Sequence, residues 1–583
     1  MTTAHTNSGT RPRTATRARM GWFALAVALY AATRVAAVFS VAANWDEFAL
    51  LDRAATTAET GVLEGGGRPG LATLILVPFA SGCQDEIAAL HDARLLWAAI
   101  TFAFLLGLAF LLGRFADASA QWRHDAWLGV GLLALVPAFL EWSIQVRSDQ
   151  LALAFGVWGG VALLASQRRV GLAAIAGGLF GLGYLATQKL IYVGALAVLL
   201  ALAQLWIERE FRPKREALRA IACALIMLGV IAAFQAATDA TLDVPAKQRA
   251  LTSLSTPNSV ANQMSEFEYY RNTIGFSQYR AILPTLVPHG LLLLALSIAT
   301  VVAGLKRRRA DRLWVAWAVL ALGGAVAAFH ASAFAYFWMT LGLFPAVAFA
   351  LAAPSLREAL PDARRQLVPL ATTGLWLVLA AQGGARIAEL TIDTQSVQRE
   401  SLSFIHRNFD EDATGFHPER APFCRHEADP LQLYFSQTIK RHFGGDTRER
   451  HTRRLVGDFR ERPVRYVVQS FRLNQFPVEV RRFMADNYQP YRASVFVAGR
   501  RLEGPGGGRS EFELIVPGRY RWLPYQTPSP IRIGDRLLAP GETAELATGN
   551  HTAEFVEDGS GGMLVLAVDD PPTTAPLAFF KAY

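Results

Sequence analysis

Ionisable side chains lie within or directly beside the long apolar segments of this 583-residue chain. Those near one end of the segments come from separate stretches of sequence: Arg34, Asp46, Glu47, Asp92, Arg94, Arg147, Asp149, Lys189 and His330. A charge inside or beside a membrane helix costs free energy and usually serves a function. A carboxylate could take a proton from a hydroxyl group, and guanidinium groups could stabilise a phosphate leaving group. The pattern therefore predicts one polar site built from several helices.

The apolar residues that must position this site come in blocks as long as a membrane helix. Hydrophobic residues make up 52% of the chain and charged residues 18%, against roughly 25% charged residues in soluble proteins. A helix needs roughly 20 residues to cross a bilayer. Eleven blocks fit: 20–42, 93–115, 126–142, 150–166, 170–187, 189–207, 219–238, 284–305, 313–331, 334–356 and 367–385. The sequence predicts a mainly α polytopic membrane protein, with residues 70–80 too short to span.

The basic residues predict the orientation of these spans. Every short loop on the side of the N-terminus carries at least two Lys or Arg residues, which favours the cytoplasmic side. This bias accounts for the net charge of +9 without a nucleic-acid partner. We expect residues 1–19 to be a basic cytoplasmic tail. A signal peptide is disfavoured, because the apolar run reaches Ala43 and no Ala-x-Ala site follows.

Eleven spans place the C-terminal part of the chain outside the cytoplasm, with the protein in the inner membrane of the cell. Residues 20–385 form the predicted transmembrane module, with long outer loops at 43–92 and 239–283. Residues 386–492 predict an α/β region, with helices near 395–409, 430–443 and 478–488 and a strand at 464–468. Short alternating runs over 493–583 predict a β-sandwich-like domain. Such a domain could bind a glycan, dock a partner or cover the membrane site.

Each charged residue also has a purely structural interpretation. Arg34 could extend its head group to the membrane interface, and Lys189 could fix the topology. Arg147 and Asp149 could be an ion pair in a tight turn, and His330 an ordinary interface residue. The pair Asp46–Glu47 fits such an interpretation least, because adjacent carboxylates repel each other.

Several local motifs resemble the membrane-embedded glycosyltransferases of the GT-C superfamily, which include protein O-mannosyltransferases and aminoarabinose transferases. The resemblance covers about residues 20–385 and rests on the order of four motifs. They are Arg34 with Trp45-Asp46-Glu47, Ala93-Arg94, Arg147-Ser148-Asp149 and Thr187-Gln188-Lys189. It implies a polyprenyl-phosphate sugar donor, a lipid, glycan or protein acceptor at the outer face of the bilayer, and inversion at the anomeric carbon.

The resemblance also implies roles for these residues. Asp46 would be the general base, and Glu47 would orient the acceptor or assist a metal. Arg94, Arg147 and Lys189 would hold the donor phosphate, and Arg34 would support Asp46 or the phosphate from below. Further candidates for substrate binding are Asp92, Asp149, His330, Tyr270 and Arg271, the last two in the aromatic-rich outer loop, where an aromatic belt is the alternative.

Two chemical questions stay open in the sequence. Some members of the superfamily use a divalent cation such as Mg²⁺ or Mn²⁺, and no Asp-x-Asp motif or His cluster decides the point here. Cys83 and Cys424 would lie in an oxidising compartment and could pair, whereas two free thiols fit equally well. Cys223 lies inside a predicted span.

Two other function classes compete with a glycosyltransferase. A transporter or flippase of lipid-linked sugars should show repeated halves and broken helices near the bilayer midplane. No such repeat is visible, and the charges gather at one end of the spans. A non-catalytic scaffold of an envelope polysaccharide assembly would not need these charges at all.

Overall fold

The structure is a computed structural model of the whole chain. It describes residues 13–580 except 65–68, 115–121, 168, 209–210, 245–274, 307–309, 330–336, 360–366, 391–393, 419–420, 426–438, 440–442, 526, 558–560 and 574–576. The chain divides into two compact units. Unit 1 comprises residues 1–40, 56–77 and 91–389, and unit 2 comprises 41–55, 78–90 and 390–583. Parts of the first outer loop therefore belong to the same unit as the C-terminal region.

Three helices of the first 113 residues contain residues of both units. They are α2 (Trp45–Thr60), α3 (Leu71–Ala80) and α4 (Glu86–Gly113). With only ten residues, α3 is too short to cross a bilayer. It occupies the segment 70–80, for which the sequence predicted no span.

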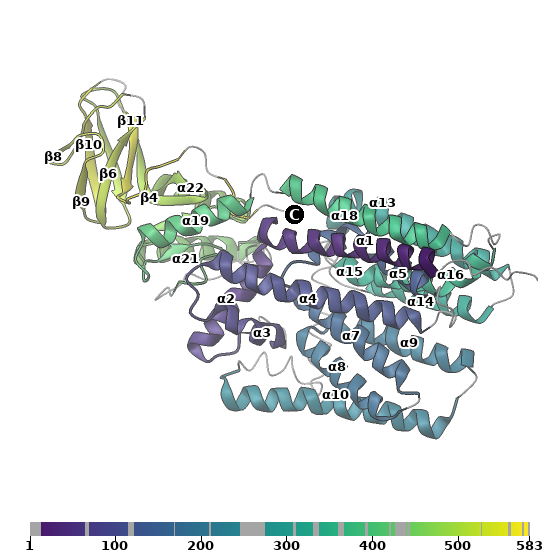
Figure 1. The fold of residues 1–583 in the computed structure, drawn as a ribbon. Coiled ribbons are helices and arrows are strands. Elements are labelled where there is room, and N and C mark those ends of the chain that lie inside the picture. The colour runs from purple at the N-terminus through teal and green to yellow at the C-terminus, as the bar shows by residue number, and fades with distance from the viewer. Residues whose placement is uncertain are drawn as a thin grey trace, which may run out of the picture. The chain divides into compact units, whose positions relative to one another are not determined.

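Unit 1 is built from helices (Figure 1). After α1 (Arg13–Ser40) and most of α4, the described helices are α5 (Trp122–Ala134), α6 (Pro137–Trp142), α7 (Ser148–Ala165), α8 (Gly171–Ala186), α9 (Leu190–Glu208), α10 (Pro213–Thr241), α13 (Gly275–Leu305), α14 (Ala310–Phe329), α15 (Trp338–Leu341), α16 (Leu343–Ala359) and α18 (Leu367–Leu390). Their apolar side chains form a core that includes Leu108, Val130, Leu200 and Val347. The prediction of a mainly α, polytopic membrane protein is confirmed.

Among the described residues, seven helices are long and apolar enough to cross a membrane. They coincide with seven of the eleven predicted spans: Met20–Ser40, Glu86–Gly113, Ser148–Ala165, Leu190–Ile207, Pro213–Thr241, Trp338–Leu356 and Val368–Ala385. The other four predicted spans fall on α5 with α6, on α8, on α13 and on α14. The segment 126–142 differs from its prediction because Pro137 begins a new helix and holds Val136 in an extended conformation.

Helices α8 and α10 pack side by side at glycine residues (Figure 1). A Cβ atom on Gly177 would lie 2.1 Å from the carbonyl oxygen of Cys223. A Cβ atom on Gly181, one turn later, would lie 3.0 Å from Val230 and 3.1 Å from the carbonyl oxygen of Met227. Small residues four apart are typical of membrane helices whose backbones approach closely. This contact explains why Cys223, the free cysteine of the described residues, occupies a helix interface.

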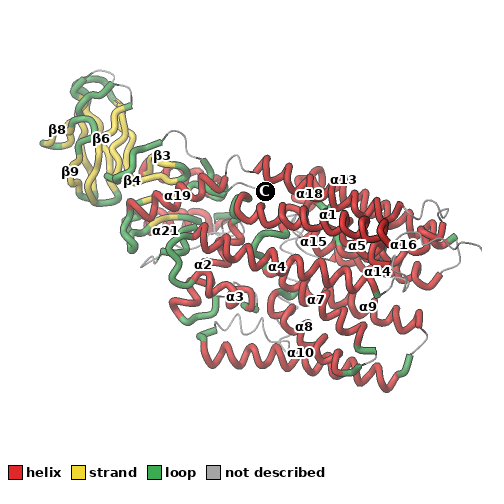
Figure 2. Tube along the Cα trace, viewed as in Figure 1, coloured by secondary structure: helices red, strands yellow, loops and turns green. Residues whose placement is uncertain are grey.

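Unit 2 holds the strands of the described chain (Figure 2). Its helices are α19 (Thr394–Asn408), α21 (Arg448–Glu461) and α22 (Val478–Asn487). The strands are β1 (Gly415–Phe416), β2 (Tyr466–Val468), β3 (Tyr488–Arg492), β4 (Val495–Glu503), β5 (Arg509–Leu514), β6 (Gly518–Pro524), β7 (Ile531–Ile533), β8 (Arg536–Leu538), β9 (Thr543–Leu546), β10 (Gly549–Phe555) and β11 (Gly561–Leu566). The helices predicted near 395–409 and 478–488 are present, and most of 430–443 lies outside the described residues.

These strands form a seven-stranded and a four-stranded sheet. In the larger sheet, β2 and β3 both pair with residues 495–497 of β4 and therefore lie on opposite sides of it, with Val497 opposite Tyr466 of β2. The following residues of β4, 499–503, pair with β11. The sheet therefore continues across residue 492, where the sequence predicted a boundary between an α/β region and a β-sandwich. The β3–β4 hairpin turns at residues 493–494, whereas the pairing of β4 with β2 and β11 joins residues far apart in the sequence, which the local pattern near 493 did not reveal.

Candidate functional site

The two adjacent carboxylates stand in the first turn of α2, in unit 2. The side-chain oxygen of Asn44 accepts a hydrogen bond from the backbone N–H of Asp46 at 3.0 Å. Glu47 Oε2 accepts one in return from the backbone N–H of Asn44 at 2.9 Å. This is a reciprocal capping box, in which Glu47 is fully buried and Asp46 is half-buried. The motif Asn-x-x-Glu at residues 44–47 signals this cap in the sequence, but the roles expected for Glu47 did not include it.

Three arginines of unit 1 are buried close to the segment between α6 and α7. Arg34, on α1, donates hydrogen bonds to the carbonyl of Leu140 and to Ser143 Oγ. Arg147 immediately precedes α7, with its guanidinium carbon 5.4 Å from the centre of the Trp142 ring. Arg34 is 5% exposed and Arg147 is 2% exposed, so water contributes little to stabilising either charge.

Helix α4 brings the third arginine to the same place. Arg94 is fully buried and donates to the carbonyl of Val38 at 3.2 Å. Trp97, one helical turn further along α4, donates its indole N–H to the carbonyl of Arg147 at 2.7 Å. Thr101, the next turn, donates to the carbonyl of Ser143 at 2.7 Å. These bonds fasten residues 143–147 to the face of α4 that carries Arg94.

Asp149 and Lys189 add an ion pair to this part of unit 1. Lys189 Nζ lies 3.2 Å from Asp149 Oδ1, and the Lys189 side chain is 20% exposed while Asp149 is 5% exposed. The ammonium also lies 5.9 Å from the centre of the Phe337 ring. Lys189 thus has a defined ion-pair partner, which a residue that only fixes the topology would not need. Asp149 also stands in the first turn of α7, where a negative charge favours the helix.

The remaining candidates are Asp92, three residues outside the described part of the chain, and the two carboxylates of unit 2. Asp92 is exposed on α4. His330, Tyr270 and Arg271 lie outside the described residues. Asp46 and Glu47 belong to unit 2, whereas Arg34, Arg94, Arg147 and Lys189 belong to unit 1.

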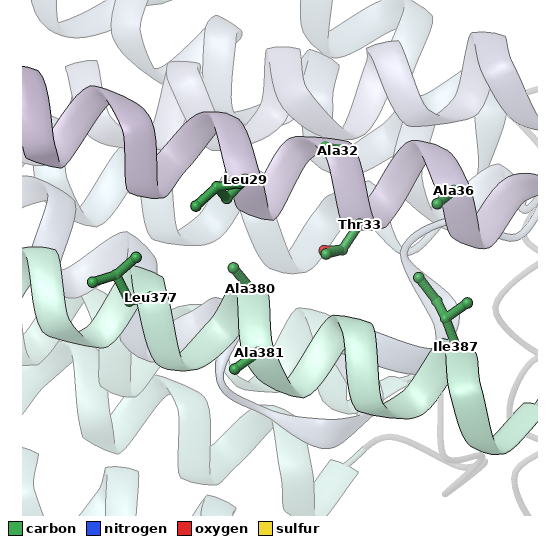
Figure 3. Close-up of a pocket in the computed structure, with 8 residues that line it drawn as sticks. All are labelled: Leu29, Ala32, Thr33, Ala36, Leu377, Ala380, Ala381 and Ile387. Carbon is green, nitrogen blue, oxygen red and sulfur yellow. The ribbon is translucent and has the colours of Figure 1, made fainter.

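Unit 1 also contains an apolar cavity of about 510 Å³ between α1 and α18 (Figure 3). Its walls are Leu29, Ala32, Thr33 and Ala36 from α1, and Leu377, Ala380, Ala381 and Ile387 from α18. Thr33 is the polar residue of this lining, and its hydroxyl already donates to the carbonyl of Tyr30 at 2.7 Å. The cavity therefore offers an apolar surface and no group suited to proton transfer.

Metal ligands do not gather in the part of the chain that the structure describes. No group of three or more His, Cys, Asp or Glu side chains could hold an ion there. The carboxylates of Asp46 and Glu47 alone are fewer ligands than a divalent cation usually takes. The Glu47 carboxylate also caps a helix.

A disulfide joins the first outer loop to the C-terminal region within unit 2. Cys83 and Cys424 are bonded, with their Cα atoms 5.2 Å apart. Beside it, buried Glu86 accepts the backbone N–H of Cys424 at 3.1 Å and lies 2.9 Å from His406 Nε2. The sequence left open whether Cys83 and Cys424 are paired or free, and in the structure they are paired. Disulfides persist in oxidising compartments and are rare in the cytosol.

We expect thiol labelling to distinguish the three cysteines. Under denaturing, non-reducing conditions one thiol per chain should react, that of Cys223, and three should react after reduction. Replacing both Cys83 and Cys424 by Ser should destabilise unit 2, by up to about 5 kcal/mol in the chain-entropy account of so long a loop. Intact-mass measurement of the labelled protein checks the pairing. Three reactive thiols before reduction would contradict it.

Comparison of the chain with known proteins gives matches among solved structures alone. No family model and no curated protein matches it. In solved structures, it resembles an oligosaccharyltransferase. This protein of Archaeoglobus fulgidus, solved in complex with Zn and sulfate, gives a TM-score of 0.49 at 11% identity, covering 94% of this chain and 98% of the other. Its apo form gives a TM-score of 0.48 at 10% identity, covering 96% and 98%.

Both matches are resemblances, and identities of 10–11% assign no site residue to this chain. The roles proposed below therefore rest on the chain's own side chains.

Proposed function

We propose that this protein is an inverting glycosyltransferase of the inner membrane. It moves a sugar from a polyprenyl-phosphate donor to a hydroxyl group of a lipid, glycan or protein at the outer face. The observation that carries the proposal is the burial of Arg34, Arg94 and Arg147 around the segment between α6 and α7. Guanidinium groups suit a phosphate anion, because their planar N–H groups can contact two of its oxygens at once.

The proposed reaction is a direct displacement. The Asp46 carboxylate accepts the proton of the acceptor hydroxyl while the acceptor oxygen attacks the anomeric carbon. The bond between the anomeric carbon and the phosphate oxygen breaks, and polyprenyl phosphate leaves with the bonding electrons. Because the leaving group is already an anion, no second acid has to protonate it, unlike in a glycosidase. The proton on Asp46 then passes to water, and the configuration at the anomeric carbon is inverted.

The cations stabilise the departing phosphate in this scheme. Arg94 and Arg147 contact its oxygens, and Arg34 holds the segment 140–143 from which Arg147 is presented. Lys189, oriented by Asp149, adds a further positive charge. Preorganised charge in a poorly hydrated site stabilises the transition state more than charge in water does. Asp92, His330, Tyr270 and Arg271 are the candidates for contacts to the rest of the substrates.

Glu47 has a different role in this proposal from the one inferred from sequence. Its carboxylate closes the capping box of α2, so it fixes the backbone that carries Asp46. The scheme requires no contact between Glu47 and the acceptor or a divalent cation.

The orientation of the protein is supported by two independent features. Lys and Arg residues favour the cytoplasmic side for the N-terminus. The disulfide between Cys83 and Cys424 suits an extracytoplasmic unit 2. Residues 386–583, divided on sequence grounds at 492, would then act outside the cytoplasm as an acceptor-binding, partner-docking or covering module.

Mass spectrometry of lipids and surface glycans in a deletion strain tests the function. We expect one sugar to be lost from the acceptor and the prenyl-linked donor to accumulate. Complementation with the wild-type gene should reverse both changes. If the donor accumulates only on the cytoplasmic side, the protein is a flippase, and if lipids and glycans are unchanged under expressing conditions, the proposal is wrong.

A further inference from the structure

The backbone just before Asp46 is held by a glutamine from the C-terminal region. Gln398, on α19, is fully buried. Its Oε1 accepts the N–H of Ala43 at 2.9 Å, and its amide group donates to the carbonyl of Ala43, also at 2.9 Å. Both polar groups of the Ala43 backbone are thus paired with one side chain.

The same glutamine links this backbone to the end of the chain. Its amide group also donates to the carbonyl of Phe579 at 2.9 Å. Phe579 in turn donates its N–H to the carbonyl of Gln469 at 2.8 Å, and Phe471 donates to the carbonyl of Phe580 at 3.3 Å. Phe579 and Phe580 are therefore fixed by backbone hydrogen bonds as well as by packing.

A cluster of aromatic rings holds the backbone just after Asp46. Phe48 is fully buried, and its ring centre lies 5.3 Å from that of Phe423, 5.8 Å from that of Phe579 and 5.5 Å from that of Phe580. Trp45 is covered by the Arg472 guanidinium, whose carbon lies 4.0 Å from the ring centre. All of these residues belong to unit 2.

We propose that Gln398 and the C-terminal residues Phe579 and Phe580 are positioning residues for Asp46. They fix the chain at Ala43, three residues before Asp46, and at Phe48, two residues after it. A general base must be placed within a few tenths of an ångström, and a shift of about 1 Å can cost about 10²-fold in rate. This inference rests on the proposed function of Asp46.

The substitution Gln398→Met tests the inference, because it keeps the length of the side chain and removes its three hydrogen bonds. We expect kcat of the purified, reconstituted protein to fall about 10²-fold, with KM for the polyprenyl-phosphate sugar changed less than about threefold. Amide exchange in the peptide 41–50 should become at least about tenfold faster. Arg399→Met, at the next and exposed position of α19, is the matched control and should change neither quantity.

A second pair of variants covers the case in which Gln398→Met does not fold, as judged by loss of the Cys83–Cys424 disulfide. Phe579→Ala should lower kcat, and Phe579→Leu should restore most of it, because Leu refills part of the space beside Phe48. Unchanged kcat in a variant whose exchange is faster would overturn the inference, as would unchanged exchange. If the wild-type protein transfers no sugar, the proposed function fails, while the exchange result still decides whether these residues hold the segment.

Discussion

Asp46→Asn should lower sugar transfer by about 10³-fold, because an amide cannot accept the proton of the acceptor hydroxyl. Asn preserves the volume of the side chain, and the backbone N–H of residue 46 still donates to Asn44. The capping box and the disulfide should therefore form as in the wild-type protein. Transfer from a polyprenyl-phosphate sugar in proteoliposomes measures the effect.

Two further variants distinguish the loss of the general base from a disturbance of the structure around it. Asp535→Asn changes an exposed aspartate in the turn between β7 and β8 and should leave the rate unchanged. Glu47→Gln should retain more activity than Asp46→Asn, since the Gln side-chain oxygen still accepts the N–H of Asn44. Full activity of Asp46→Asn would remove Asp46 from the mechanism.

Arg147→Gln should lower kcat/KM by about 10²-fold, with most of the loss in kcat. The charge on the phosphate grows as the leaving group departs, so a guanidinium stabilises the transition state more than the bound donor. Arg147→Lys keeps the charge but loses the planar, two-pronged contact, so we expect a loss of about tenfold. Steady-state kinetics with a varied donor concentration distinguish the two effects.

Arg114→Gln provides the control, because Arg114 is exposed at the end of α4 on the side predicted to be cytoplasmic. Its rate should equal that of the wild-type protein. A loss in Arg147→Gln confined to KM would show that Arg147 only binds the donor. Equal activity of Arg147→Gln and the wild-type protein would contradict a role in phosphate stabilisation.

The helical part of the fold could be read from the sequence because membrane helices are specified by local composition. The seven helices from Met20–Ser40 to Val368–Ala385 coincide with predicted spans for this reason. The helix break at Pro137 was not predicted, because hydropathy is averaged over a window of residues and one proline changes that average little. The pairing of distant segments could not be predicted in this way. The pairing of β4 with β2 and β11 and the Cys83–Cys424 bond join residues far apart in the sequence, and no local pattern specifies them.

The candidate site was predictable only in its residue types. The sequence singled out Arg34, Arg94 and Arg147, and the structure adds that all three are buried around one segment. The capping role of Glu47 was visible in the motif Asn-x-x-Glu. Gln398 was not detectable, because its partners Ala43 and Phe579 lie 355 and 181 residues away.

A map of the full-length protein with a non-transferable polyprenyl-phosphonate sugar tests most directly whether these groups act on one donor. We predict the phosphonate oxygens within hydrogen-bonding distance, about 3 Å, of the Arg94 and Arg147 guanidinium groups, with the Asp46 carboxylate facing the anomeric carbon. A phosphonate bound away from these three side chains, for example beside the apolar cavity between α1 and α18, would contradict the account.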